Sequence, residues 1–365
     1  MANNPTLFYS GLRSKSRDVN VMQELPEVPR NVKMVSSGRG NLCIVTHDDQ
    51  IYTLDRDSLE PRLSRIDPSG EILNGRRIQA ASCGGYHTII LTEEKPRLFA
   101  LGTNFFGECF VSTETKFLET LTPIHLKRSA EICKIDTGAN FSVVMFRDGT
   151  IQRSGHSCNY ELWLLDIPPA VRTSSGSLHT VIIAQNGRCY GTGYNERAQL
   201  GNGTTRNSNE AFTEMLLPDE IEAHNVYCGS IHTLVLDTLN GLWLCGTNLA
   251  ISMNMLPVYV PQKIRFFEGN NLIIKEISTH LAHHVSVLTA CGCLYTVGAN
   301  GRGQLATNSF ESKSQFHKVQ LELGTKHILS TVVGENNTFI IVGEHKPNSI
   351  QRRINSFFDL TFIFS

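Results

Sequence analysis

The chain repeats one short pattern, and this repetition restricts its fold more than any other feature. Residues 176–195 read GSLHTVIIAQNGRCYGTGYN, and residues 229–248 read GSIHTLVLDTLNGLWLCGTN. Each copy has a His, an apolar strand, a tight turn, a second apolar strand and then Gly-x-Asn. Residues 84–104 and 281–300 follow the same order. Because a unit of this size cannot bury its apolar surface alone, we expect the copies to stack into one continuous core.

The spacing of the copies is regular, although three copies are weaker than the other four. The His and the Gly stand 14 residues apart in three copies and 15 in a fourth. The weaker copies have Asn41, Phe141 or Asn337 in place of the His, and Asp55 stands where the first of them should have its Gly. The seven starts are at positions 41, 87, 141, 179, 232, 284 and 337, with intervals of 46, 54, 38, 53, 52 and 53 residues.

The turns and strands within each copy predict a hairpin with two buried faces. Asp148-Gly149, Asn186-Gly187 and Asn240-Gly241 separate the apolar runs, and such pairs suit the type I′ turn, in which both central residues have positive φ. The strand at 180–183 is apolar on both faces, which is typical of a strand buried on both sides. Blades stacked around a ring provide that burial.

The two ends of the chain predict how the ring closes. The last copy runs from Asn337 to Val342 and then loses the pattern, so it lacks its second hairpin strand. Residues 7–11 are an unpaired strand that matches residues 294–298. We therefore expect an all-β, seven-bladed β-propeller that is closed by an N-terminal strand. Its domains would be the propeller at residues 1–343 and a C-terminal tail at residues 344–365, whose end is aromatic.

Composition excludes several classes of function. The 365 residues carry a net charge of −1 with a pI near 6.9, so the basic excess needed for strong nucleic-acid binding is missing. No apolar run approaches the roughly 18 residues of a membrane span, and no secretory signal is recognisable. We expect a monomer inside the cell, in the cytoplasm or the nucleus.

The ten cysteines include no C-x-x-C pair, so the chain lacks the combination of Cys and His pairs that marks a zinc finger. Most of them stand in apolar runs, as buried free thiols do, whereas Cys291 and Cys293 would point to one face of a strand. We predict reduced thiols, no metal and no cofactor.

One segment identifies a known family by resemblance. Residues 193–203 read GYNERAQLGNG, which resembles the G-x-N-x-x-G-Q-L-G signature of the RCC1 repeat, with Ala198 in place of one Gly. Residues 298–305 are a second copy, followed by Ala306 instead of Gly, and residues 104–110 are a degraded third. The resemblance covers about residues 7 to 343. WD40 and kelch repeats fit less well, because no Trp-Asp pair ends a repeat and Gly84-Gly85 is a lone doublet.

The residues that recur in the repeats are expected to be structural. The glycines allow an unusual φ at a strand end, the asparagines bond the backbone of their own loop, and the histidines bond a buried carbonyl between strands. These residues are Gly102, Gly193, Gly246, Gly298, Asn104, Asn195, Asn248, Asn300, His87, His179, His232 and His284. Because their blades diverge around a ring, the four histidines are not expected to form a metal site.

Three segments that depart from the repeat are candidates for partner binding. Phe105-Phe106 aligns with the polar pair Glu196-Arg197, so the two rings would be exposed anchors or would pack on a neighbouring loop. Trp163 stands in the apolar segment 160–164, which would otherwise be a blade strand. Arg265 and Phe266 mix charge and aromatic character between two repeats, as interface cores do, or form a connecting strand.

Function follows only from the resemblance, because no catalytic motif is present. The resemblance implies a protein-interaction propeller that binds or regulates a small GTPase without a catalytic centre of its own. The alternative is a true guanine-nucleotide exchange factor, since the founding RCC1 group acts on Ran. The projecting hairpin and the acidic residue of that group cannot be assigned here, and the shortest interval, 38 residues, argues against a large hairpin after the third repeat. The family's photoreceptors rely on clustered tryptophans, and Trp163 and Trp243 are too few for that role.

Overall fold

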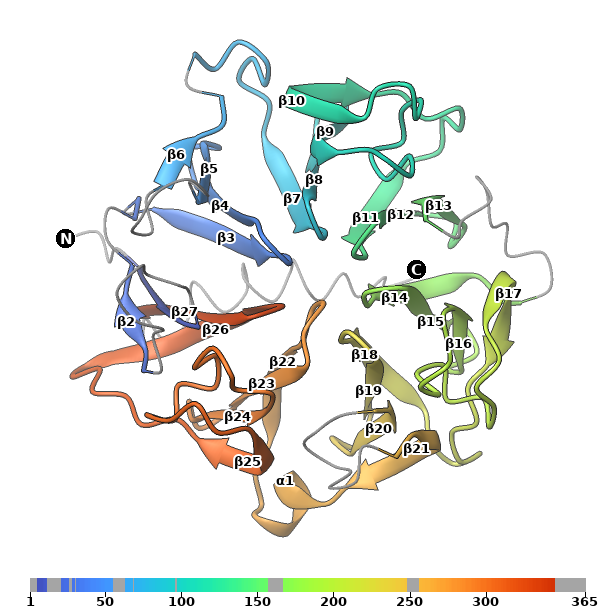
Figure 1. Ribbon diagram of the computed structural model, residues 1–365, viewed down its shortest axis with the longest axis vertical. Coiled ribbons are helices and arrows are strands. Elements are labelled where there is room, and N and C mark those ends of the chain that lie inside the picture. Colours follow the sequence, from blue (N-terminus) through green and yellow to red (C-terminus); the bar gives the residue numbers. More distant parts are fainter. Residues whose placement is uncertain are drawn as a thin grey trace, which may run out of the picture.

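The computed structural model describes nine ranges: residues 5–11, 21–25, 28–29, 31–54, 63–67, 69–95, 97–156, 167–247 and 256–344. They form seven antiparallel sheets arranged around a ring, which confirms the seven-bladed propeller (Figure 1). Across the described ranges, no helix is both long enough and apolar enough to cross a membrane.

The first four blades follow one another along the chain, each written here from its innermost strand outward. Blade 1 comprises β3 (Val32–Ser37), β4 (Leu42–Thr46), β5 (Ile51–Leu54) and β6 (Leu63–Arg65). Blade 2 comprises β7 (Ile78–Cys83), β8 (His87–Thr92), β9 (Leu98–Thr103) and β10 (Phe117–Ile124). In blade 3 the described strands are β11 (Ile132–Thr137), β12 (Phe141–Phe146) and β13 (Ile151–Gly155). Blade 4 comprises β14 (Ala170–Ser175), β15 (His179–Ala184), β16 (Cys189–Gly193) and β17 (Ser208–Glu214).

The last three blades include the closure of the ring. Blade 5 comprises β18 (Ala223–Cys228), β19 (His232–Asp237), β20 (Leu242–Gly246) and β21 (Val258–Ile264). A four-residue helix, α1 (Phe266–Gly269), lies on the way to blade 6. Blade 6 comprises β22 (Ile274–Ser278), β23 (His284–Thr289), β24 (Leu294–Gly298) and β25 (Lys313–Lys318). Blade 7 comprises β26 (Lys326–Gly334), β27 (Asn337–Glu344), β1 (Thr6–Ser10) and β2 (Gln23–Glu24).

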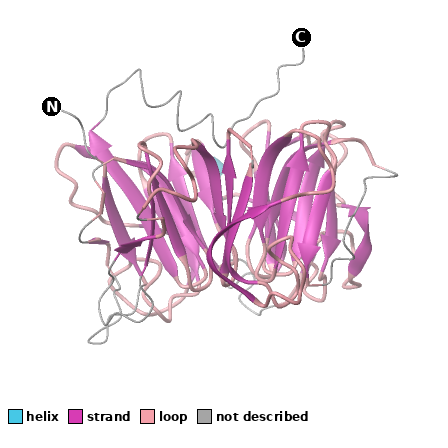
Figure 2. Cartoon of the chain, turned by 90° about the horizontal axis from the view of Figure 1, so that it is seen from above, coloured by secondary structure: helices cyan, strands magenta, loops and turns pink. Residues whose placement is uncertain are grey.

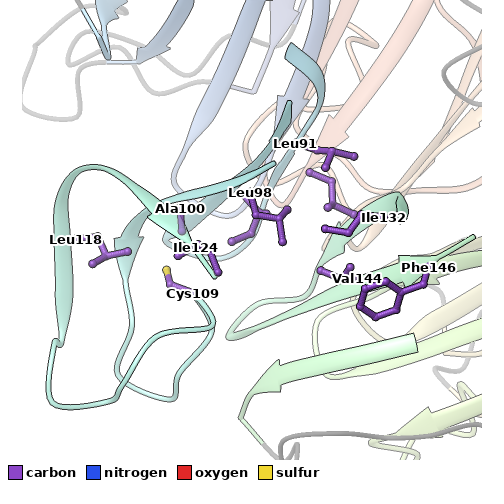
Figure 3. Packing of buried hydrophobic residues seen from close by; sticks show 11 residues of the cluster. Leu91, Leu98, Ala100, Cys109, Leu118, Ile124, Ile132, Val144 and Phe146 are labelled. Atoms are coloured by element: carbon purple, nitrogen blue, oxygen red, sulfur yellow. The ribbon is translucent and has the colours of Figure 1, made fainter. Parts of the chain in front are cut away.

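The second strand of each blade begins at or next to one of the seven repeat starts. These strands are buried along their whole length in blades 2 to 6, as their apolar sequences require. Seven clusters of buried apolar side chains fill the spaces between neighbouring blades. In one of them, Leu91 and Leu98 of blade 2 pack with Ile132, Val144 and Phe146 of blade 3 (Figure 3). The core therefore lies between the blades and is continuous around the ring.

The N-terminal segment closes the ring, as the sequence predicts, and contributes more than one strand. β1 pairs with β27 over its full length, from Thr6 opposite Val342 to Ser10 opposite Thr338. The hydroxyl of Ser10 also donates to the carbonyl of Gly303 in blade 6. β2 then pairs with β1 and forms the outer edge of blade 7.

The strands run between two faces of the ring (Figure 2). We call the end at which the second strands begin the histidine face; it carries the turns between first and second strands and the loops between third and fourth strands. The opposite end, the hairpin face, carries the turns between second and third strands and the connections from blade to blade. On the histidine face, the turns of neighbouring blades are hydrogen-bonded to one another, as in Gly85 N to Ala139 O (2.8 Å) and Ala139 N to Ser177 O (2.9 Å). These bonds make that face a continuous rim.

Candidate functional site

The recurrent Gly and Asn build the loops of the histidine face. Gly193 has φ +106°, and a Cβ there would stand 2.4 Å from the carbonyl of Leu178, so a side chain is excluded. Asn195 is buried: its Oδ1 accepts from Leu200 N, and its Nδ2 donates to the carbonyls of Thr204 and Arg206. The other members of this set behave alike in the described residues, namely Gly102, Gly246, Gly298, Asn104 and Asn300. Asn248 lies outside the described residues.

The four histidines join neighbouring blades, and each ring lies within hydrogen-bond distance of a hydroxyl group of the next blade. His179 Nε2 lies 3.0 Å from Thr233 Oγ1, and His87 Nε2 lies 2.8 Å from Ser142 Oγ. His232 and His284 have the same arrangement with Thr279 and Thr338. The sequence predicts a backbone carbonyl as the partner. It does not reveal the hydroxyl group, because the residue that carries it stands one blade away. For His87, His179 and His284, a backbone hydrogen bond adds to this contact.

Replacement of one of these histidines is expected to destabilise the fold without touching the surface. His179→Ala removes a fully buried ring and leaves the Thr233 hydroxyl without this partner, so the free energy of unfolding should fall by about 2–4 kcal/mol. Urea unfolding measures the loss. His224→Ala, which truncates an exposed side chain in β18, is the control and should change stability little. Equal stability of both variants would contradict a structural role for His179.

The same histidines make stability depend on pH. Burial lowers the pKa of His87, His179, His232 and His284 to about 3 from an ordinary value of 6.5. Below pH 6.5 the unfolded chain therefore binds protons that the folded chain does not, and each histidine removes up to about 1.4 kcal/mol per pH unit. Burial also raises the pKa of Glu276 to about 7 from an ordinary value of 4.5. Between these two values the folded chain binds a proton that the unfolded chain does not, which offsets the effect of one of the four histidines.

We expect the free energy of unfolding to fall steadily as the pH is lowered from 6.5 toward 3. Urea titrations at several pH values measure the slope, which should be smaller by about one proton in His179→Gln. A stability that is constant between pH 6.5 and 5 would contradict the depressed pKa values.

Exposed aromatic rings of blade 2 form the candidate partner site. Phe105 and Phe106, on the loop after β9, keep 57% and 46% of their surface exposed, and Tyr86, on the turn before β8, keeps 40%. The carbonyl of Tyr86 accepts from Thr103 N at 3.0 Å, so the two segments lie side by side on the histidine face. We call Tyr86, Phe105 and Phe106 the aromatic patch. Large exposed rings of this kind anchor protein partners.

A buried carboxylate positions the patch. Glu108, 1% exposed, accepts from the backbone N–H of Phe106 through Oε2 at 2.8 Å. Gln199 makes the equivalent bond to Arg197 N in blade 4, at 3.0 Å. Phe106 also meets His156 of blade 3 edge-on, with ring centroids 5.0 Å apart. The loop that presents the two phenylalanines is therefore held in one conformation.

A basic group borders the patch on the blade 1 side. The Arg39 guanidinium lies over the Tyr86 ring, 5.9 Å from its centroid, and its Nε pairs with Glu335 Oε2 at 3.0 Å. The Arg39 side chain remains 53% exposed, so it is accessible to a partner together with the patch. Arginine beside aromatic rings is the composition of protein-interface centres.

Two of the other sequence candidates, Arg265 and Phe266, do not join this surface. Arg265 and Phe266 lie between blades 5 and 6 on the hairpin face, where the segment forms α1 instead of a connecting strand. Phe266 packs on the rings of Phe267, Tyr295 and Phe316, so it covers the core between blades 5 and 6. Trp163 lies outside the described residues. The structure therefore places Arg265 and Phe266 apart from the aromatic patch.

Sequence reasoning missed Tyr86, Arg39 and Glu108. Tyr86 immediately precedes the repeat His, where Leu178 and Ile231 stand in blades 4 and 5, so an apolar residue at this position matches the repeat. Glu108 stands where the signature has Gln, in the degraded third copy. A position-by-position comparison of the loops would have found both.

The described residues hold no cluster of three or more His, Cys, Asp or Glu side chains suited to a metal ion. The nine described cysteines are free thiols, seven of them buried. Cys158 lies outside the described residues.

Comparisons with known proteins agree with this geometry. No protein-family model matches the chain. The ultraviolet-B receptor UVR8 of Arabidopsis thaliana is 23% identical over 356 residues, which cover 87% of this chain and 78% of the receptor. An RCC1 repeat-containing protein of Schizosaccharomyces pombe is 24% identical over 310 residues, which cover 77% of this chain and 80% of that protein.

A solved structure shows the same fold. Prp20p of Saccharomyces cerevisiae, the yeast RCC1, superimposes with a TM-score of 0.78 at 14% identity, covering 98% of this chain and 95% of Prp20p. Three observations agree: the repeated Gly, Asn and His, the seven blades of the ring, and the relatives named above. The chain is a seven-bladed β-propeller whose relatives in sequence and in fold are RCC1-repeat proteins.

Proposed function

We propose that this chain is a protein-interaction propeller that binds or regulates a small GTPase through the aromatic patch, without a catalytic centre of its own. The observation that carries the proposal is that three large rings are exposed on adjoining loops of one blade. The loops at the same positions of blades 4 and 6 carry Glu196-Arg197 and Gly301-Arg302 instead. Since the loop is fixed by Glu108, binding orders few side chains and its entropic cost is low.

The choice of a GTPase rests on the family. The structure of Prp20p is known together with the binding of Prp20p to Gsp1p and to histones. A histone or nucleic-acid role is not part of the proposal, because the net charge of this chain is −1 and a basic excess is missing. We place the protein inside the cell, in the cytoplasm or the nucleus, and expect it to act as a monomer.

Exchange activity is the second candidate. An exchange factor needs no general base, because it acts by stabilising the nucleotide-free conformation of its GTPase.

Release of a fluorescent GDP analogue from a panel of small GTPases tests both candidates. We expect capture of one GTPase by the propeller in a pull-down, with a release rate that is unchanged or nearly so. Strong acceleration at amounts of propeller well below that of the GTPase would establish exchange activity. Failure to capture any member of the panel would contradict a GTPase partner.

A further inference from the structure

The hairpin turn between β23 and β24 carries two neighbouring thiols, Cys291 and Cys293, on either side of Gly292. Cys291 is exposed and Cys293 is half-buried, whereas the seven other described cysteines are buried. The turn lies on the hairpin face of blade 6, at the opposite end of the ring from the aromatic patch. Nothing in the propeller architecture requires thiols at this position, because the same turn in blades 3 and 4 is built with Asp148-Gly149 and Asn186-Gly187.

The turn holds the two thiols together. Gly292 N donates to Thr289 O at 2.9 Å, and Gly292 has φ +81° with open space around its Cα. Cys293 N donates to Thr289 Oγ1 at 3.2 Å, and the same hydroxyl lies 3.1 Å from Cys291 Sγ. The thiols of Cys291 and Cys293 are close enough to hydrogen-bond to each other. The backbone therefore brings both sulfur atoms to one side of a short, fixed turn.

A lysine on the neighbouring strand completes the cluster. Lys318 ends β25, where it stands opposite Tyr295 in the strand pairing, and its ammonium group hydrogen-bonds Cys293. The thiol contact raises the pKa of Lys318, so the lysine stays charged. Hydrogen bonds from Thr289 and from the backbone of Cys293 lower the pKa of Cys291. A cation and donors around an accessible thiol favour the thiolate, which is the reactive form.

We propose that Cys291, Cys293 and Lys318 form a redox-active dithiol site that reacts with small-molecule disulfides of the glutathione class. The Cys291 thiolate attacks one sulfur of glutathione disulfide, which forms a mixed disulfide and releases one glutathione thiolate. The Cys293 thiolate then attacks Cys291 Sγ, which forms the Cys291–Cys293 disulfide and releases the second glutathione thiolate. Two protein thiols are oxidised, one glutathione disulfide is reduced to two thiols, and the two protons go to solvent or to the released thiolates.

The assignment of roles follows from exposure. Cys291 is the accessible sulfur and so attacks first, whereas Cys293 is half-buried beside Lys318 and resolves the mixed disulfide. The disulfide that closes spans a single intervening residue, and because Cys291 is exposed, the bond is accessible to reduction. Such a pair suits reversible exchange better than permanent cross-linking. The inference is independent of the proposed function, because the site lies on the other face of the ring.

The first experiment exposes the folded protein to glutathione disulfide, quenches with acid and maps peptides by mass spectrometry. Cys158→Ser serves as the background, because that cysteine lies outside the described residues. We expect the peptide with both thiols to lose two hydrogen atoms, while the buried cysteines stay unmodified. A product of the background protein that carries stable glutathione adducts on both cysteines, with no internal disulfide, would overturn the proposal.

Variants separate the roles of the three residues. Cys293→Ser should accumulate the mixed disulfide at Cys291, and Cys291→Ser should react about tenfold more slowly than the background protein. Lys318→Met should also slow the reaction, whereas Lys313→Met, on the same strand at its other end, should not. Because none of Cys291, Cys293, Lys313 and Lys318 belongs to a core cluster, thermal unfolding should show each variant folded. Equal rates in Lys318→Met and Lys313→Met would show that Lys318 is not part of the site. Equal rates in all variants would refute the proposed dithiol site.

Discussion

Deletion of residues 1–11 is expected to lower the free energy of unfolding by about 3–6 kcal/mol, the largest effect on stability that we foresee. The deletion removes β1, which supplies the third strand of blade 7. Leu7 and Tyr9 of this strand are 0% and 5% exposed, and burial of each such side chain contributes about 1.5–3 kcal/mol.

The loss extends beyond these two side chains. Without β1, one edge of β27 has no partner, and β2 loses the strand to which it is bonded. Ser10, fully buried, also loses its bond to Gly303 of blade 6. An open sheet edge in place of a closed ring is a site for aggregation, so the shortened protein should also lose solubility.

Thermal and urea unfolding measure the effect, and deletion of residues 345–365 is the matched control. If the ring is complete at the end of β27, as the division into propeller and tail proposes, the control deletion leaves the melting temperature unchanged. An N-terminal deletion that melts like the full chain would show that β1 is dispensable for closure. A large loss in the control would place the tail in the folded unit.

The sequence predicted the ring because each blade repeats the same physical requirements. The spacing from His179 to Gly193 places both residues opposite each other at one end of a hairpin, where they pair in the structure. Closure was predictable because the last repeat lacked a strand and the N-terminus had one to spare. β2, by contrast, has two exposed residues, Gln23 and Glu24, and no apolar pattern could reveal it.

The candidate site was only partly predictable, because surface positions are not constrained by the repeat. The departure of Phe105 and Phe106 from the polar residues of other blades was visible in the sequence, and the structure places both rings in solvent. The similar departure at Phe266 proved to be packing over the core, since apolar character alone does not separate a buried ring from an exposed one. Tyr86 and Arg39 joined the site through contacts between neighbouring turns and blades, which depend on the closed ring.

Phe105→Ala combined with Phe106→Ala is expected to weaken partner binding by about one hundredfold while the fold is retained. Truncation of an exposed aromatic anchor costs about 1–3 kcal/mol of binding, and the two rings stand on one loop, so their losses need not be additive. Stability should change little, because both side chains are about half exposed and neither lies in a core cluster. Calorimetry or surface-based binding with the captured GTPase gives the affinity.

The control variants should truncate exposed apolar side chains at other places on the surface of the propeller. Phe310→Ala truncates a 46% exposed ring on the corresponding loop of blade 6, on the same histidine face, and Leu239→Ala truncates an 84% exposed side chain on the hairpin face. If the aromatic patch is the contact, both controls bind normally. If Leu239→Ala weakens binding and the double variant does not, the partner docks on the hairpin face. Equal losses in the double variant and Phe310→Ala would indicate a contact spread over the histidine face. Because Glu108 fixes the loop backbone through Phe106 N, which the alanine variant retains, a loss confined to the double variant is attributable to the rings themselves.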